Sequence, residues 1–313
     1  MKRSSHLKPF YLVGLFWLTV SLACNLGAPQ PQTPPAPTFV VIPAESTNTE
    51  VAAPLPADTE TATDPTETTP TGCPTDTFVD VSTYHPRSGW PAPKLNVTCD
   101  AEFMTIETNG VPNFAVAIQQ NDKTFSVKLP LNPQKNSQPT DFRGGIVGVA
   151  VDGVQIWAPL EAPQDGFADP VKEGLIETCG GHAKPFHFHA NPTCLFPSEE
   201  NKTSLVLGYA IDGFSILAPY TCDDAACTKI RKVKSSWQFS GANSRNVWDF
   251  YKYVEGSGDL DRCNGMIGPD GLYHYYATDT FPYFIACYSG TPTTPIGDTG
   301  AGEPGGNPPP KKP

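Results

Sequence analysis

The sequence has no long apolar segment and very little helical periodicity. Its longest apolar run, Phe10–Val20, is about half of the roughly 20 residues that a bilayer-spanning helix needs. The net charge is −11 and no basic stripe occurs, so the chain is not expected to bind nucleic acid. A G-x-S-x-G elbow, an H-E-x-x-H motif and a phosphate-cradling glycine loop are also missing. These absences argue against a transmembrane anchor, a nucleic-acid-binding protein and a standard hydrolase.

Residues 1–24 have the features of a secretory signal. Basic residues (Lys2, Arg3 and Lys8) precede the apolar run, and small residues precede Cys24. The tetrapeptide SLAC resembles a bacterial lipobox, with Ser21 where that motif usually has leucine. We therefore expect an extracytoplasmic protein that a lipid on Cys24 anchors to the membrane at the bacterial cell surface. Ordinary cleavage, which would give a secreted protein, is the alternative.

The two ends of the remaining chain differ in composition from the middle. Residues 25–72 are rich in proline, threonine, alanine and acidic residues and contain no lysine or arginine. Residues 291–313 are rich in glycine and proline and have no periodic apolar pattern. Both segments offer too little apolar surface to pack, so we predict a disordered tether and a disordered tail. One folded domain, residues 73–290, is expected between them.

The cysteine count fits an exported, disulfide-rich domain. Of nine cysteines, lipidation of Cys24 would leave eight, enough for four disulfides in an oxidising compartment. Eight cysteines permit many pairings, and we prefer the pairs that are closest in sequence. These pairs are Cys73–Cys99, Cys179–Cys194, Cys222–Cys227 and Cys263–Cys287.

Short alternating apolar runs such as FMTIET, TFSVKL and SLVLGYAI predict a mainly β domain. One pattern occurs twice, as GVAVDGVQIWAP at residues 148–159 and GYAIDGFSILAP at residues 208–219. Each copy places an Asp-Gly pair between two alternating runs, which predicts a β-hairpin with a type I′ turn. We therefore interpret Asp152 and Asp212 as turn residues rather than catalytic carboxylates.

A second pattern follows each hairpin. Both copies run from Cys-x-Gly through a variable loop to a strand rich in aromatic and imidazole rings. The two segments are CGGHAKPFHFHA (residues 179–190) and CNGMIGPDGLYHYYA (residues 263–277). The order of hairpin, cysteine loop and ring-rich strand thus occurs twice. We predict a pseudo-symmetric domain of two diverged repeats, with the two ring-rich strands as partners.

The first ring-rich strand carries a candidate metal site. Strand alternation puts His187 and His189 on one face and the phenylalanines on the other. A Cys179–Cys194 disulfide would bring His182 back over this strand. Three imidazoles suit a transition metal such as zinc or copper better than calcium or magnesium. The alternative is that the histidines only pack and form hydrogen bonds.

The second ring-rich strand offers fewer ligands. His274 and Tyr276 share one face, and His274 would complete a four-histidine site if the two strands met. The leading hypothesis is a membrane-anchored module that binds a transition metal. A metal-dependent hydrolase or oxidoreductase, assisted by Tyr276 or Asp279, is a second hypothesis. A metal-free module that binds a cell-surface polymer is a third.

Several of these motifs together resemble the YHYH proteins, exported domains with cysteine-linked loops around an aromatic-His-aromatic-His motif. The resemblance is carried by GYAIDGFSILAPY, LDRCNG, GLYHYYATDTFPYFIACYSG and CGGHAKPFHFHANPTC. It covers about residues 148–290, and we expect it to extend upstream towards Thr98. His187 and His189 match the two histidines of the motif, with phenylalanine in place of tyrosine. In the second copy His274 matches, whereas Tyr276 stands where the resemblance implies a histidine. Met266 stands where it implies a Gly-His pair.

Overall fold

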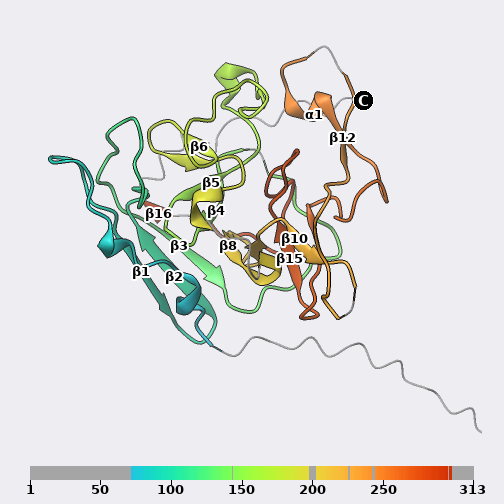
Figure 1. The fold of residues 1–313 in the computed structure, drawn as a ribbon, viewed down its shortest axis with the longest axis horizontal. Helices are drawn as coiled ribbons and strands as arrows, with labels where there is room; N and C mark the ends of the chain where they lie inside the picture. Colours follow the sequence, from blue (N-terminus) through green and yellow to red (C-terminus); the bar gives the residue numbers. More distant parts are fainter. Residues whose placement is uncertain are drawn as a thin grey trace, which may run out of the picture. The chain divides into compact units, whose positions relative to one another are not determined.

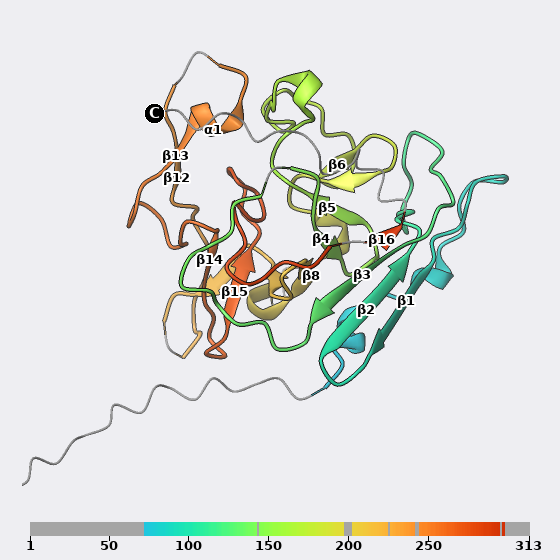
Figure 2. The same ribbon diagram turned by 180° about the vertical axis from the view of Figure 1, so that it is seen from behind.

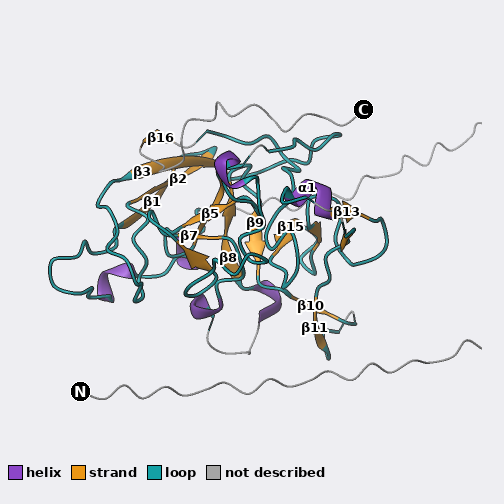
Figure 3. Cartoon of the chain, turned by 90° about the horizontal axis from the view of Figure 1, so that it is seen from above, coloured by secondary structure: helices purple, strands orange, loops and turns teal. Residues whose placement is uncertain are grey.

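The computed structural model describes residues 72–142, 144–196, 202–224, 226–241, 244–294 and 296–297. The predicted signal segment with Cys24, nearly all of the predicted tether and most of the predicted tail lie outside these residues. Strands and loops dominate, as Figure 3 shows, and the mainly β prediction is confirmed. The helical elements are one α-helix, α1 (Val247–Phe250), and short 3-10 turns at Thr75–Thr77, Val81–Thr83, Pro163–Asp165, Thr193–Leu195 and Lys202–Ser204. Among the described residues, no helix has the length and apolar character needed to cross a membrane.

An eight-stranded sheet forms the centre of the domain, in the order β14-β15-β9-β8-β4-β5-β7-β6. In Figure 2 the sheet runs from β14 and β15 through β8, β4 and β5 to β6. Its strands are β4 (Ile146–Ala150), β5 (Gln155–Trp157), β6 (Gly181–His182), β7 (His187–Phe188), β8 (Val206–Ala210), β9 (Ser215–Leu217), β14 (Gly265–Ile267) and β15 (Tyr273–Tyr276).

The sheet consists of two equivalent halves that meet at β4 and β8. In the first half β5 pairs antiparallel with β4 and parallel with β7, and β6 pairs antiparallel with β7. The strands β8, β9, β15 and β14 repeat this arrangement. The two-repeat prediction is therefore confirmed. The predicted pairing of the ring-rich strands is wrong, because β7 and β15 each pair with their own hairpin and four strands separate them.

The seam between the halves has a local two-fold symmetry. Gly148 pairs with Ala210, Val149 with Tyr209 and Ala150 with Gly208, so exchanging the repeats restores the same pairing. Both glycines are required by the close approach of the strands. A Cβ on Gly148 would lie 2.6 Å from the Tyr209 carbonyl oxygen, and one on Gly208 would lie 2.5 Å from the carbonyl oxygen of Val149.

Each hairpin turns through its Asp-Gly pair, but the predicted type I′ conformation is wrong. That turn needs positive φ at both central residues, whereas in each pair only the glycine has it, at +85° for Gly153 and +94° for Gly213. The Gly153 amide donates to the Ala150 carbonyl (2.9 Å), as in a type I turn followed by a left-handed glycine. Asp152 Oδ1 accepts a hydrogen bond from the Val154 amide (3.1 Å), so the aspartate does serve the turn.

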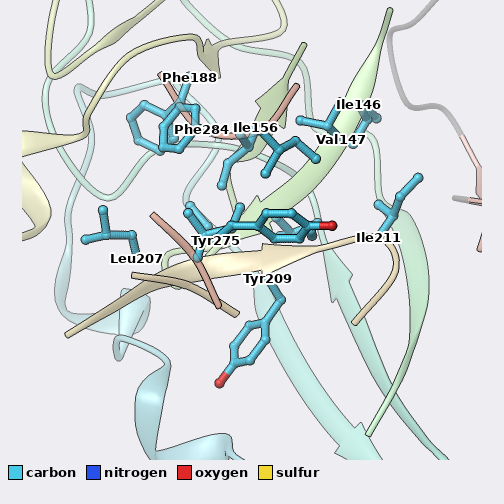
Figure 4. Packing of buried hydrophobic residues seen from close by; sticks show 14 of the residues in the cluster. Ile146, Val147, Ile156, Phe188, Leu207, Tyr209, Ile211, Tyr275 and Phe284 are labelled. Atoms are coloured by element: carbon cyan, nitrogen blue, oxygen red, sulfur yellow. The ribbon is translucent and has the colours of Figure 1, made fainter. Parts of the chain in front are cut away.

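A second, four-stranded sheet contributes to the same core. It contains β1 (Leu95–Cys99), β2 (Phe103–Thr108), β3 (Phe125–Pro130) and β16 (Ile296–Gly297), in that order. Figure 1 shows β1, β2 and β3 beside the strands of the larger sheet. One buried cluster includes Ile106 and Val127 of this sheet together with Ile156 and Tyr275 of the larger one. Figure 4 shows Ile156 and Tyr275 in this cluster. Since β16 pairs with β3, the folded part extends beyond the boundary predicted at residue 290.

Two ribbons and four disulfides complete the described structure. The disulfides are the four pairs preferred from the sequence. The ribbons pair β10 (Tyr220–Cys222) with β11 (Ile230–Lys232) and β12 (Trp237–Phe239) with β13 (Tyr251–Tyr253).

Candidate metal centre

Three histidine side chains converge at the first ring-rich strand. His182 on β6 pairs directly with His187 on β7, and His189 follows two residues later. The three rings lie 4.7 to 5.1 Å apart between centroids. One ring nitrogen from each histidine lies within 4.8 Å of the others. The structure thus brings together the three histidines that the sequence placed in one site.

The opposite face of this strand is apolar. Phe186 and Phe188 are almost completely buried in the main core cluster. Phe114 packs against both rings, at 5.5 and 6.2 Å between centroids. Alternation therefore divides the segment as predicted, with aromatic rings anchoring the strand and imidazoles facing the site.

Hydrogen bonds to the backbone orient two of the imidazoles. His187 Nδ1 lies 2.8 Å from the Pro185 carbonyl oxygen, and His189 Nδ1 lies 2.8 Å from that of Ala158. A carbonyl oxygen can only accept, so each neutral ring carries its proton on Nδ1. The lone pairs then reside on the Nε2 atoms, which is the arrangement that metal-ligating histidines need.

Glu161 is part of this cluster, and sequence reasoning missed it. Its Oε1 atom lies 3.2 Å from His182 Nε2 and 3.9 Å from His189 Nε2. Glu161 follows the first hairpin in the segment APLEAP, where the second copy has Thr221. That difference between the repeats is the signal that could have revealed it.

The polar atoms that face this centre are unsatisfied. Glu161 Oε1, His182 Nε2 and His189 Nε2 are buried and form no hydrogen bond of good geometry, although Glu161 Oε1 and His182 Nε2 lie 3.2 Å apart. Buried polar side-chain atoms in proteins nearly always have a partner, so a group of such atoms is suited to hold a metal ion or an ordered water. All three carry or can carry lone pairs, which suits a cation.

Burial keeps the imidazoles of His187 and His189 neutral. It lowers the pKa of His187 from 6.5 to about 4, although the Pro185 carbonyl opposes the shift. Burial also holds the pKa of His189 well below its usual value, and the neighbouring histidines add to the effect. The Trp157 ring stacks on His187 at 4.0 Å between centroids and shields it from solvent. At neutral pH both Nε2 atoms are therefore free to bind a metal ion.

A buried glutamine holds the loop that carries the site. Gln120 Oε1 accepts a hydrogen bond from the Phe186 amide (2.7 Å), and its Nε2 donates to the Ala183 carbonyl (3.4 Å). These contacts lie directly next to His187 and His182 in the chain. Gln120 therefore fixes the backbone between two of the candidate ligands.

A family model described as YHYH protein matches residues 126–290, which is more than half of the chain. The chain belongs to the YHYH protein family. No curated protein and no solved structure matches it. The YHYH match includes both halves of the eight-stranded sheet, the three histidines and Glu161. Strands β1 and β2 and the Cys73–Cys99 disulfide lie upstream of it.

The second half of the YHYH domain does not contribute to the candidate metal centre. His274 lies on β15, on the other side of the seam, so the predicted four-histidine site is wrong. Its Nδ1 atom lies 2.6 Å from Ser215 Oγ, and its Nε2 atom lies 2.9 Å from Asp270 Oδ2. Both ring nitrogens are thus already engaged.

The two residues that the sequence proposed as helpers in this YHYH domain also lie elsewhere. Tyr276 is buried in a small separate cluster with Leu217 and Leu260, and its hydroxyl has no hydrogen-bond partner. Asp279 is half-exposed and forms a 2.6 Å ion pair with Lys232. Neither side chain can assist chemistry at the three histidines, because β15 and the segment after it belong to the other half of the sheet.

Proposed function

We propose that this YHYH domain binds one transition-metal ion through His182, His187, His189 and Glu161. The observation that carries the proposal is the convergence of buried, unpaired ligand atoms from two separate segments of the chain. A bound cation would satisfy each of these atoms at once.

The donor set favours zinc, with copper as the alternative. Three imidazole nitrogens and one carboxylate oxygen form a ligand set that zinc takes in tetrahedral geometry, at about 2.0–2.2 Å from each atom. Tetrahedral ligands at that distance lie roughly 3.3 Å apart, close to the 3.2 Å between Glu161 Oε1 and His182 Nε2. The 3.9 Å between Glu161 Oε1 and His189 Nε2 is longer, so the side chains would have to draw together around the ion. Calcium and magnesium would require more oxygen ligands.

The same geometry favours metal capture or structural stapling over catalysis. A catalytic zinc site keeps one position open for water or substrate. Here Glu161 supplies a fourth protein ligand. Its side chain is 17% exposed, so the centre lies at the edge of the core and an ion can enter from that side.

Metal analysis of the purified full-length protein tests this proposal. After loading with zinc and removal of free metal, we expect one zinc per chain in the wild type and almost none in His187→Ala plus His189→Ala. The matched control is His274→Ala, which alters the corresponding histidine of the other half and should keep the metal. Glu161→Gln should weaken binding by more than the roughly 10–100-fold that is typical of losing an outer-shell partner. Equal metal content in the wild type and the double variant would disprove the site.

We also propose that the chain is exported and anchored to the membrane by a lipid on Cys24, with the metal-binding domain outside the cytoplasm. The signal-like segment, the lipobox-like SLAC and the four disulfides support this. Cys24→Ala should move the protein from the membrane fraction to the soluble exported fraction. Unchanged membrane retention would contradict the lipid anchor.

A further inference from the structure

The second half of the sheet contains a continuous chain of a hydroxyl, an imidazole and a carboxylate. Ser215 on β9 lies 2.6 Å from Nδ1 of His274 on β15. His274 Nε2 lies 3.0 and 2.9 Å from the two carboxylate oxygens of Asp270, in the turn before β15. Three separate elements therefore place the three groups in hydrogen-bonding order.

The carboxylate determines which way the protons point. An ionised carboxylate only accepts hydrogen bonds, so the neutral His274 ring carries its proton on Nε2 and donates it to Asp270. Nδ1 is then an acceptor, and its partner must be the O–H of Ser215. This is the relation of nucleophile, general base and orienting group that activates serine hydroxyls in acyl transfer.

The fold does not require these residues. The first half has Gln155 at the position of Ser215, and the side chain of Gln155 accepts a hydrogen bond from Trp157 Nε1 (2.8 Å). His187, the counterpart of His274, uses its Nδ1 atom to contact a backbone carbonyl. One backbone arrangement thus supports a metal-ligand set in one half and the serine–histidine–aspartate chain in the other.

We propose that Ser215 is the nucleophile of a metal-independent esterase site, with His274 as its general base and Asp270 as the group that orients the imidazole. Ser215 Oγ attacks the ester carbonyl carbon while its proton passes to His274 Nδ1. The tetrahedral intermediate breaks the bond to the alkoxy oxygen, which takes the proton from His274 and leaves as the alcohol. Water, deprotonated by the same nitrogen, then attacks the acyl-serine, releases the carboxylic acid and returns a proton to Ser215.

The surroundings define the substrate class. Ser215 is half-buried and the Asp270 side chain is 52% exposed, so this edge of the sheet borders solvent. The negative charge of Asp270 disfavours anionic esters. We therefore assign uncharged carboxylic esters as substrates.

Labelling with a fluorophosphonate probe tests the nucleophile directly. The full-length protein is treated with the probe in the presence of a chelator, so that the metal centre of the other half is empty. Peptide mass spectrometry should find the adduct on Ser215, and Ser215→Ala should remain unlabelled. His274→Gln should slow both labelling and p-nitrophenyl acetate hydrolysis by about 100-fold or more, as expected for loss of a general base.

Two further variants separate catalysis from structure. Ser257→Ala removes a hydroxyl that donates to the Ser236 and Val254 carbonyls and accepts from Gln238 Nε2, with no hydrogen bond to Ser215, His274 or Asp270, so it should leave the labelling rate unchanged. Asp270→Asn should lower the rate less than His274→Gln does, and the rise of rate with pH should persist in Asp270→Asn but vanish in His274→Gln. Absence of labelling in the folded wild type would overturn the proposal, as would equal labelling of wild type and His274→Gln. Neither outcome affects the metal proposal, which is measured without the probe.

Discussion

Strands β7 and β15 hold equivalent places in the sheet, and each carries a histidine directly opposite the preceding short strand. His187 faces His182 on β6, whereas His274 faces Met266 on β14. In the first pair His182 Nε2 forms no hydrogen bond of good geometry and lies 3.2 Å from the Glu161 carboxylate, whereas in the second pair both ring nitrogens of His274 are engaged, by Ser215 and Asp270. The comparison teaches that strand pairing fixes where these side chains lie and that only a few side chains decide the chemistry.

Each half has a disulfide that closes its cysteine loop, and removing these two disulfides should have different effects on metal affinity. Cys179–Cys194 closes a 15-residue separation and Cys263–Cys287 a 24-residue separation, so loss of either should lower the free energy of unfolding by about 3 kcal/mol. Only the first bridge encloses His182, His187 and His189. Paired Cys→Ala variants, compared by denaturant unfolding and zinc titration, should therefore both lose stability. Only Cys179→Ala plus Cys194→Ala should also lose metal affinity; equal zinc affinity in the two paired variants would contradict this expectation.

Metal removal should destabilise the protein through the first half alone. A ligand present at 100 times its Kd stabilises the folded state by about 2.7 kcal/mol. For a domain of this size that corresponds to a Tm shift of roughly 5–10 °C. Calorimetry with and without chelator should show this shift in the wild type and in His274→Ala. The shift should disappear in His187→Ala plus His189→Ala, and its persistence there would place the metal elsewhere.

Substitution of the turn aspartates should give the smallest difference between the halves, and the difference should appear in the pH dependence of the unfolding free energy. Burial raises the pKa of Asp152 from 3.8 to about 7, and it also raises the pKa of Asp212. A raised carboxyl pKa favours the folded state at acid pH, and this contribution is lost as the pH rises from about 4 through about 7. Asp212 Oδ2 accepts hydrogen bonds from Tyr275 and Gly290, which favour its charged form.

Asp152→Asn should therefore reduce the fall in unfolding free energy between pH 4 and pH 8, by at most about 4 kcal/mol. Asp212→Asn should reduce it less. Urea unfolding across this range measures both variants. A larger effect of Asp212→Asn than of Asp152→Asn would show that the hydrogen bonds from Tyr275 and Gly290 do not offset the rise in pKa that burial causes.

Much of the centre could be predicted because its residues are close in sequence. Alternation in PFHFH defined the two faces of the strand, and the nearest cysteines formed the disulfides. Glu161 was missed because it meets His182 only through the tertiary pairing of β5 with β7. The same reason explains the error at His274. Sequence alternation does not reveal which strand will pair with the edge of a hairpin. In the structure each ring-rich strand pairs with the hairpin of its own repeat, β7 with β5 and β15 with β9.

The two-fold seam between β4 and β8 also bears on the origin of the domain. Its register maps onto itself when the repeats are exchanged, and each repeat supplies one of the two glycines at the crossing. That is the geometry of an isologous interface between identical subunits. A single ancestral copy could thus have built the same sheet as a symmetric homodimer with two identical sites. Fusion of the two copies into one chain would then have allowed the side chains of the two halves to diverge.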